Sequence, residues 1–213
     1  VWRRLADWPG QPLLQTRFEQ ALVREKPAPA TVIRLMTGRP PITEGAAMLL
    51  TRAYLEVGRE KDAAATIGAY WRAERFETEA EARIRKEFGK LIPAADYKAR
   101  LDRLLYEEQN AAATRNAKYL NSNEIALAAA VIAVDNESGA AAALKAVPAA
   151  KRKDPLYLYA QARYLREQDK LEEAAAALLS APRDPGVIDG DAWWVERRIV
   201  ARALLDQGDA RTA

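Results

Sequence analysis

The sequence predicts an all-α protein, and two observations lead to this prediction. Ala supplies 45 of the 213 residues, whereas Val, Ile and Thr together supply only 28, a composition that favours helices over strands. Glycine and proline fall between apolar stretches of helical spacing, at points where helices begin or end. We therefore expect a single domain over residues 1–213, an α-superhelix of about a dozen helices in stacked, irregular hairpins.

Helix signals divide the first half of the chain into short helices. Thr43 is expected to cap one helix and Gly58 to end it, and a tight turn then leads to a second helix from Glu60. Ala63 and Gly68 give this second helix a face of small residues that allows close packing. The helices expected in this half cover residues 12–26, 29–38, 43–58, 60–72, 78–88 and 93–105.

The second half carries similar signals. Asp154 followed by Pro155 is an N-cap with proline at the first helical position. The following helix is expected to form an antiparallel hairpin with the helix from Leu171. The helices expected in this half cover residues 108–120, 123–134, 138–147, 155–165, 171–179 and 191–205.

Three segments, at unequal intervals, share one residue pattern. Each has a pair of large residues, a short turn and then a small residue, and the pairs begin at Tyr54, Tyr164 and Leu204. This pattern is typical of tetratricopeptide-like hairpins, which stack because a lone hairpin leaves apolar surface uncovered. The third segment contains only the start of its second helix. We therefore expect the chain to be the N-terminal part of a longer protein.

The composition also excludes several classes of function. The chain has no His and no Cys, which excludes Ser-His-Asp and Cys-His catalysis, the usual zinc sites and disulfides. A net charge of +3 with interspersed signs gives no basic arm for nucleic acid. No apolar run approaches the roughly 20 residues that span a bilayer. We expect no cofactor, no metal and no membrane span.

One short string suggests glycan chemistry. Residues 135–139 place Glu137 before Ser138 near the start of a helix, where a Glu can act as a general acid. The favoured interpretation is a capping turn between two helices, because the alanines that follow supply no group to hold a sugar ring. An independent enzyme that uses Glu137 is the least favoured hypothesis.

Two further clusters are candidates for binding. In residues 193–198 a helix places Trp194 on the same side as Arg197 or Arg198, a combination that stacks on sugar rings, although such tryptophans more often belong to the core. Residues 151–153 form the densest basic cluster, interpreted as a solvated loop that is also able to contact an anionic polymer. Residues 83–87, with Arg83, Arg85 and Lys86 beside acids, are interpreted as a solvated helix face.

Several strings together resemble one protein family. They are RLDRLLY (100–106), VP (147–148), DPLY (154–157), YLR (164–166), EEAA (172–175) and WWVER (193–197), with PPIT (40–43) and EVGR (56–59) before them. Their order and approximate separation are similar to those of the N-terminal superhelical domain of the soluble lytic murein transglycosylases. The resemblance covers nearly the whole chain.

This resemblance implies an enzyme exported to the periplasm. Such enzymes cleave the bond between N-acetylmuramic acid (MurNAc) and N-acetylglucosamine (GlcNAc) in peptidoglycan without water, and form 1,6-anhydro-muropeptides. In that family the catalytic Glu stands in a Glu-Ser motif of a lysozyme-like C-terminal domain, followed by a Gly-Leu-Met-Gln-like stretch. Here Glu137 lies inside the superhelical region, and Met36 and Met48 both precede it, so no catalytic residue is carried over.

The resemblance thus implies a non-catalytic scaffold that positions peptidoglycan glycan strands for its own C-terminal catalytic domain, which this chain does not contain. The alternative is a tetratricopeptide-like adaptor that binds other proteins, since stacked hairpins suit either function. The sequence assigns no catalytic, cofactor-binding or metal-binding residue, and it leaves the ligand-binding residues open.

Overall fold

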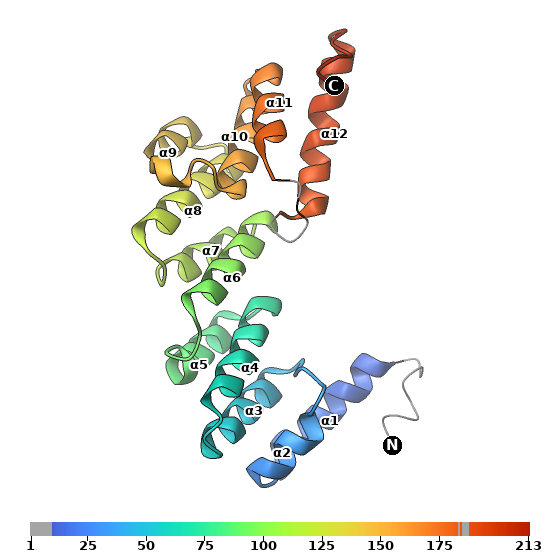
Figure 1. Ribbon diagram of the computed structural model, residues 1–213, viewed down its shortest axis with the longest axis vertical. Coiled ribbons are helices and arrows are strands. Elements are labelled where there is room, and N and C mark those ends of the chain that lie inside the picture. The colour runs from blue at the N-terminus through green and yellow to red at the C-terminus, as the bar shows by residue number, and fades with distance from the viewer. Residues whose placement is uncertain (1–9, 183, 185–187) are drawn as a thin grey trace. The chain divides into compact units, whose positions relative to one another are not determined.

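The computed structural model describes residues 10–182, 184 and 188–213, and Figure 1 shows its ribbon. In these residues the chain forms twelve α-helices, one short 3-10 helix (η2) and no strand, so the all-α prediction is confirmed. The helices are α1 (Gln11–Glu25), α2 (Pro29–Met36), α3 (Glu44–Glu56), α4 (Glu60–Ala73), α5 (Thr78–Phe88), α6 (Ala94–Tyr106), α7 (Asn110–Ala117), α8 (Ser122–Asp135), α9 (Ala140–Ala146), η2 (Ala149–Lys151), α10 (Pro155–Glu167), α11 (Leu171–Ser180) and α12 (Gly190–Asp206).

The chain forms two compact units. Unit 1 covers Val1–Tyr97 and unit 2 covers Lys98–Ala213, so the boundary falls inside α6. Each unit has its own apolar core, and the two are described separately below. The expectation of a single superhelical domain stays a prediction. Within the part of the chain that is described, no helix is both long and apolar enough to cross a membrane.

Two of the predicted helix caps are present. The hydroxyl of Thr43 accepts a hydrogen bond from the backbone N–H of Ala46 at the start of α3. The carboxylate of Asp154 accepts one from the N–H of Leu156 at the start of α10, where Pro155 occupies the first helical position. Both caps satisfy backbone N–H groups that the helix itself leaves without an acceptor.

Five of the described helices end in one and the same turn. At the C-terminus of α3, Gly58 has a left-handed backbone with φ 73°, and the N–H of Arg59 donates to the carbonyl of Tyr54 at 2.8 Å. This bonding is that of a Schellman motif, which ends a helix at a residue of positive φ. The same pattern recurs at α6, α8, α10 and α12, with left-handed residues Glu108, Glu137, Asp169 and Gly208.

The shared turn sets the register of the helices that follow it. Two residues after the left-handed residue that follows α3, α6 and α10, the chain enters α4, α7 and α11, and each of these has an Ala at the same register position. Those alanines, Ala63, Ala113 and Ala174, are all 0% exposed. The sequence pattern located the turns at Gly58, before Lys170 and at Gly208 but did not include the one at Glu108, where no glycine stands although Ala111, Ala112 and Ala113 follow.

In unit 1, α1 and α2 pack on α3, and α3 packs on α4. The core between α1, α2 and α3 consists of Leu22, Val32, Met36, Ala46, Leu50 and Ala53. On α4, Gly68 faces the carboxylate of Asp96, and any Cβ at position 68 would collide with it. The predicted close approach at Gly68 is therefore present, and Arg72 donates a hydrogen bond to the same carboxylate.

Glu19 on α1 is a fully buried acid in unit 1. Its carboxylate accepts hydrogen bonds from the backbone N–H groups of Ile42 (3.0 Å) and Thr43 (2.8 Å) and from the Thr43 hydroxyl (2.7 Å). Gln15 donates to Glu19 at 2.9 Å and to the carbonyl of Pro40 at 2.8 Å. Glu19 and Gln15 therefore hold the segment before α3 against α1.

The helix face around residues 83–87 is not simply solvated. Arg83 donates two hydrogen bonds of 2.8 Å to Glu44, and Arg52 donates to Glu87, so two ion pairs link α5 to α3. Glu81 on the same helix is buried at 4% exposure. Arg83, Lys86 and Glu87 are exposed, as expected of a solvated face, whereas Glu81 is buried. The partners of Arg83 and Glu87 come from α3, which no spacing within α5 reveals.

In unit 2, α10 packs on α8, α9, α11 and α12, and α11 also packs on α12, so α10 is central (Figure 1). One core surrounds α8 and a second lies between α10, α11 and α12. The second contains Trp193, which is 0% exposed and donates its indole N–H to the Tyr106 hydroxyl at 3.0 Å. Burial raises the pKa of the Tyr106 hydroxyl, which therefore stays protonated.

Candidate binding grooves

Glu137 occupies a helix C-cap. It is the left-handed residue, with φ 52°, that follows α8, and its N–H donates to the carbonyl of Val134. The N–H of Ser138 donates to the carbonyl of Ala133, which completes the same motif that ends α3. Both Glu137 and Ser138 are exposed. The geometry is the capping turn of the favoured interpretation, and it gives Glu137 a structural role.

The two tryptophans of residues 193–198 have different environments. Trp193 belongs to the core, and the Arg197 guanidinium lies over its ring at 5.3 Å from the centroid. Trp194, the next residue of α12, is 63% exposed. Glu196 is buried and accepts hydrogen bonds of 2.8 and 3.2 Å from Arg166 of α10. The core interpretation is therefore right for Trp193, and Trp194 remains as a surface aromatic.

The basic cluster 151–153 is mostly engaged by the protein itself. Lys151 pairs with Glu124 and, at 3.3 Å, with Asp154. Arg152 donates to the carbonyls of Val147 (3.0 Å) and Lys145 (2.9 Å), which α9 leaves without helical donors. Arg152 and Lys153 are exposed, as expected of a solvated loop, whereas Lys151 is half-buried. Both Lys151 and Arg152 nevertheless have partners within the same unit.

Lys151 is part of a larger group that we call the lysine–carboxylate cluster, which consists of Lys98, Asp102, Glu124, Lys151 and Asp154. Lys98 donates to Asp102 at 2.5 Å and lies 3.8 Å from Glu124 and 3.7 Å from Asp154. Burial raises the pKa of Asp102 to about 6 even though Lys98 opposes the shift. These groups come from α6, α8, η2 and the N-cap of α10, so the cluster ties those elements together.

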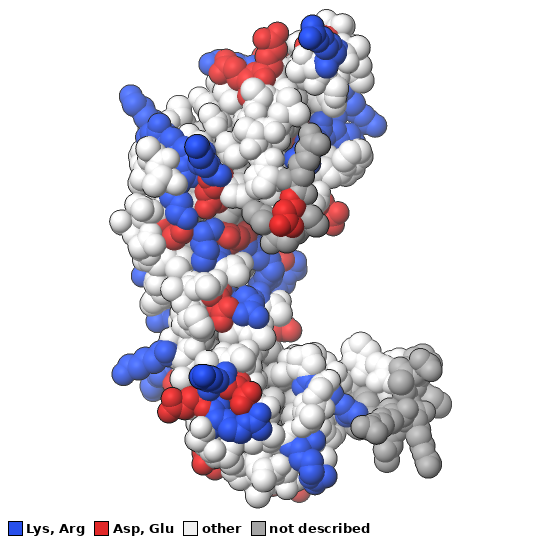
Figure 2. Space-filling view, in the orientation of Figure 1, with Lys and Arg blue, Asp and Glu red and all other residues white. Residues whose placement is uncertain are grey.

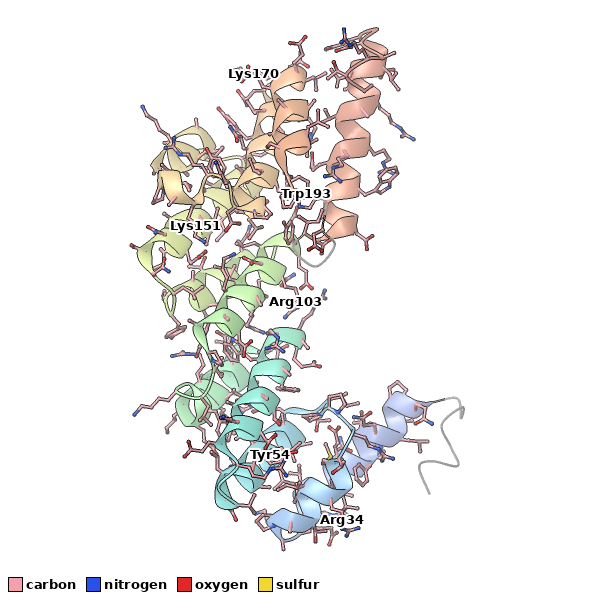
Figure 3. The ribbon with its side chains drawn as sticks, in the orientation of Figure 1. Arg34, Tyr54, Arg103, Lys151, Lys170 and Trp193 are labelled. Atoms are coloured by element: carbon pink, nitrogen blue, oxygen red, sulfur yellow. The ribbon has the colours of Figure 1, made fainter. Side chains whose placement is uncertain are left out.

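The first groove lies in unit 1, and we call it the Tyr54 groove. It has a volume of about 800 Å³ and is lined by the end of α2, the segment 37–41, α3 and α4. Tyr54, labelled in Figure 3, projects from α3, and the Arg59 guanidinium lies over its ring at 4.7 Å from the centroid. Arg59 also donates to Asp62 at 2.7 Å. Glu19 and Gln15 fix the segment 40–43 and thereby one wall of the groove.

The other side of the Tyr54 groove adds polar groups to this aromatic surface. Arg39, Thr66, Tyr70 and Glu74 all line it. Burial, with a contribution from Glu74, raises the pKa of the Tyr70 hydroxyl, which therefore remains protonated at neutral pH. The groove thus combines aromatic rings with guanidinium groups and carboxylates, groups that contact the faces of sugar rings and exchange hydrogen bonds with their hydroxyls.

The second groove lies in unit 2 between α11 and α12, and we call it the Trp194 groove. It has a volume of about 610 Å³, and Leu178, Leu179, Trp194, Ala201 and Leu205 form its apolar lining. The charged groups among its described lining residues are Arg197, Arg198 and Arg202, and no carboxylate lies among them. This groove is therefore apolar with a basic margin, in contrast to the mixed lining of the Tyr54 groove.

The structure offers little support for metal chemistry or for binding to a polyanion by charge alone. Within the described ranges, no three acidic side chains lie close enough together to hold a metal ion. On the face that Figure 2 shows, basic and acidic side chains are interspersed in both units. The candidate sites therefore depend on local groups rather than on a broad electrostatic field.

Comparisons with protein-family models, with curated proteins and with solved structures found no significant match. The resemblance to the lytic transglycosylase scaffold therefore rests on the sequence strings alone.

Sequence reasoning identified only part of these two grooves. It selected Trp194, Arg197 and Arg198, which line the second groove together, but it grouped them with Trp193, which is buried. It treated Tyr54 only as an apolar residue of a helix. No local signal distinguishes Tyr54, because the groove around it is formed by three helices and a linker that meet only in the folded unit.

Proposed function

We propose that this chain is a non-catalytic helical scaffold that positions peptidoglycan glycan strands for the catalytic domain of a periplasmic soluble lytic transglycosylase. The observation that carries the proposal is the Tyr54 groove. An accessible ring flanked by Arg39, Arg59 and Asp62 suits a strand of N-acetylated sugars, whose ring faces are apolar and whose edges are polar. The sequence strings that resemble the family scaffold supply the biological context.

The chemistry proposed for the Tyr54 groove is binding without catalysis. The Tyr54 ring would stack on a sugar face, and the guanidinium groups of Arg39 and Arg59 would pair with the carboxylates of the stem peptides. Holding the strand in one orientation lowers the entropic cost of its reaction in a neighbouring catalytic domain. The exposed capping position of Glu137 supports a scaffold over an independent enzyme.

The experiment is co-sedimentation of the purified chain with isolated sacculi at increasing salt. We expect retention that weakens with salt, because guanidinium–carboxylate pairs at a surface are screened. The double variant Arg39→Ala/Arg59→Ala should reduce retention by about tenfold, the effect of losing about 1.4 kcal/mol of binding energy. The matched control is Arg24→Ala/Arg34→Ala, which removes the same charge from α1 and α2 outside the groove.

Three outcomes contradict the proposal. Equal losses in the two double variants mean that retention follows net charge and not the groove. Release of anhydro-muropeptides by the chain itself contradicts a non-catalytic scaffold. Recovery of a stoichiometric protein partner, with no retention on sacculi, favours the tetratricopeptide-like adaptor.

A further inference from the structure

The repeated turn gives unit 1 an aromatic ring where the other described turns have an aliphatic residue. Four residues before the left-handed residue, α3 has Tyr54, whereas α6, α10 and α12 have Leu and α8 has Ala. The three leucines are at most 8% exposed, but Tyr54 is partly exposed and lines the Tyr54 groove. A departure from a shared local pattern is expected at a functional site.

Three contacts hold Arg59 beside this ring. The backbone N–H of Arg59 donates to the carbonyl of Tyr54 at 2.8 Å, and the guanidinium lies over the ring at 4.7 Å from its centroid. The guanidinium Nε donates to the carboxylate of Asp62 at 2.7 Å. Because both ends of this long side chain are restrained, the guanidinium has a defined orientation before any ligand binds, which lowers the entropic cost of binding.

The terminal edge of the Arg59 guanidinium is available to a ligand. Its Nε is engaged by Asp62, but among the residues that the structure describes neither Nη1 nor Nη2 has a hydrogen-bond acceptor. The side chain is 49% exposed. The N–H groups of these two nitrogens lie parallel in one plane, and this geometry matches the two oxygens of a carboxylate.

The other charged groups of the groove are engaged or distant from Arg59. The carboxylate of Asp62 is paired with Arg59 itself, and Glu74 lies about 18 Å further along α4, at the C-terminal end of that helix. Arg39 also lines the groove, but its guanidinium lies over the ring of Phe18 on α1, at 6.0 Å from the centroid. Arg59 is therefore the best placed group for an anion next to Tyr54.

The surface of α4 leaves room for a ligand beside these groups. Ala65, Ala69 and Ala73 line the groove, and their spacing of four residues places them on one face of the helix. Small side chains on this face keep the groove open along α4. A sugar ring and a short peptide attached to it can therefore lie beside Tyr54 with a carboxylate at Arg59.

A guanidinium held in this way distinguishes a carboxylate from a carboxamide of the same shape. Both oxygens of a carboxylate accept hydrogen bonds, one from each terminal nitrogen. A carboxamide has one accepting oxygen, and its NH₂ group would meet an N–H group of Arg59, so that two donors face each other. The carboxamide also lacks the charge that strengthens such bonds.

We propose that Arg59, positioned by Asp62, binds a free carboxylate of the stem peptide, so that the Tyr54 groove selects glycan strands whose stem peptides are not amidated at that group. This inference rests on the proposed function and adds the chemical state of the ligand. Asp62 is a positioning residue, because it acts on the ligand only through Arg59.

The test is an NMR titration of the ¹⁵N-labelled chain, followed at the backbone amides of residues 54 and 59. The first ligand is a GlcNAc–MurNAc disaccharide that carries a short stem peptide with a single carboxylate, and in the second ligand that carboxylate is a primary amide. We expect the carboxylate ligand to bind about tenfold more tightly. Arg59→Met should remove this difference, whereas the control Arg34→Met, on an exposed part of α2 outside the groove, should keep it.

The role of Asp62 is tested by the direction of its effect. Asp62→Ala removes a negative charge, so a purely electrostatic effect would tighten binding of the carboxylate ligand. We expect instead that binding weakens by about threefold, because the guanidinium loses its orientation. Asp62→Asn keeps an acceptor for Nε without the charge and should bind at least as tightly as the original chain. Tighter binding by Asp62→Ala would contradict a positioning role.

The remaining outcomes separate this inference from the proposed function. Saturable binding of both ligands with equal affinity overturns the inference and leaves the groove as a glycan site. Absence of binding to both ligands overturns the inference together with the glycan site. If the same peptide without sugar binds as tightly as the carboxylate ligand, the groove accepts peptide carboxylates in general, which overturns the glycan-borne ligand and favours the adaptor.

Discussion

The two units hold acidic side chains by different means, with backbone and hydroxyl donors in unit 1 and with a lysine in unit 2. In unit 1 the carboxylate of Glu19 is surrounded by backbone N–H groups and a hydroxyl at the start of α3, where the helix dipole also favours a negative charge. In unit 2 the carboxylate of Asp102 is paired with Lys98 among other acids, and its pKa rises to about 6. Fixed donors satisfy the oxygen atoms of Glu19, whereas burial raises the pKa of Asp102 despite its pairing with Lys98.

The largest effect that tests this comparison is expected from Glu19→Ala. Removal of the carboxylate leaves the N–H groups of Ile42 and Thr43 without an acceptor in a buried place, which should lower the free energy of unfolding by about 3 kcal/mol. Urea denaturation measures the loss, and amide hydrogen exchange should show it first in unit 1. The control Glu25→Ala, on the exposed end of α1, should change little. Equal effects of the two substitutions would contradict the role given to Glu19.

A neutral buried polar pair is expected to contribute less than Glu19. Trp193→Phe removes the hydrogen bond to the Tyr106 hydroxyl and part of the indole volume, and should cost about 2 kcal/mol. Thermal denaturation measures this change. Trp194→Phe is the matched control, because that side chain is 63% exposed, and its melting temperature should stay close to that of the unchanged chain. A larger loss of stability for Trp194→Phe than for Trp193→Phe would contradict the assignment of Trp193 to the core.

The stabilities of the two units are expected to change in opposite directions as pH changes. The pKa of Asp102 rises from 3.8 to about 6 through burial, so between these pH values the folded state binds more protons than the unfolded state. The contribution of Asp102 to the stability of unit 2 therefore decreases as pH rises from 4 to 6. A third of its side chain is exposed, so screening reduces the change to the order of 1 kcal/mol.

In unit 1 the sign is reversed. Hydrogen bonds from Arg83 and Arg52 lower the pKa values of Glu44 and Glu87 below 4.5, so these pairs stabilise unit 1 above that pH and lose their effect as pH falls. Hydrogen exchange across this pH range, corrected for intrinsic rates, measures both units in one experiment. Asp102→Asn should reduce the response of unit 2 and leave that of unit 1 unchanged, and Asp135, whose pKa burial also raises to about 6, should maintain the remainder in unit 2. A response of the same sign in both units would contradict the assignment.

The smallest effect is expected at the surface ion pair of Arg83. Arg83→Met removes both hydrogen bonds to Glu44, but the guanidinium is exposed, so the melting temperature should hardly change. The pKa of Glu44 should return toward its ordinary value, because the hydrogen bond from Arg83 is the main cause of its shift. A carboxylate titration by NMR measures this change. A large loss of stability would show that the pair does more than hold one surface contact.

The helices themselves were largely predictable, because their signals are local. Thr43, Asp154 and Pro155 mark helix starts through bonds made within one turn of helix, and Gly58 and Gly208 mark ends through a backbone that glycine adopts freely. The end of α6 was expected at residue 105, but the turn at Glu108 was not recognised as one of the repeated type, because no glycine takes the left-handed backbone there. The position of this turn follows from the packing of the hairpin and not from the backbone preference of Glu108.

The grooves and the buried charges were not predictable in the same way. Arg152 and Lys151 are consecutive in a basic run, yet one caps α9 and the other pairs with Glu124 of α8. The sequence string that contains Trp193 and Trp194 gives no indication of which ring is buried, since one residue of helix rotation separates core from surface.

The sequence by itself determined that this protein is helical, where most of its helices begin and end, and that three of its turns belong to one repeated type. These properties depend on composition and on contacts a few residues apart. The tertiary structure alone decided that Glu19 holds the segment before α3, that Asp102 joins a cluster from several elements, and that Tyr54 and Trp194 line two different grooves. Such properties require groups that are distant in the chain to meet, and only the packing of the helices within each unit brings them together.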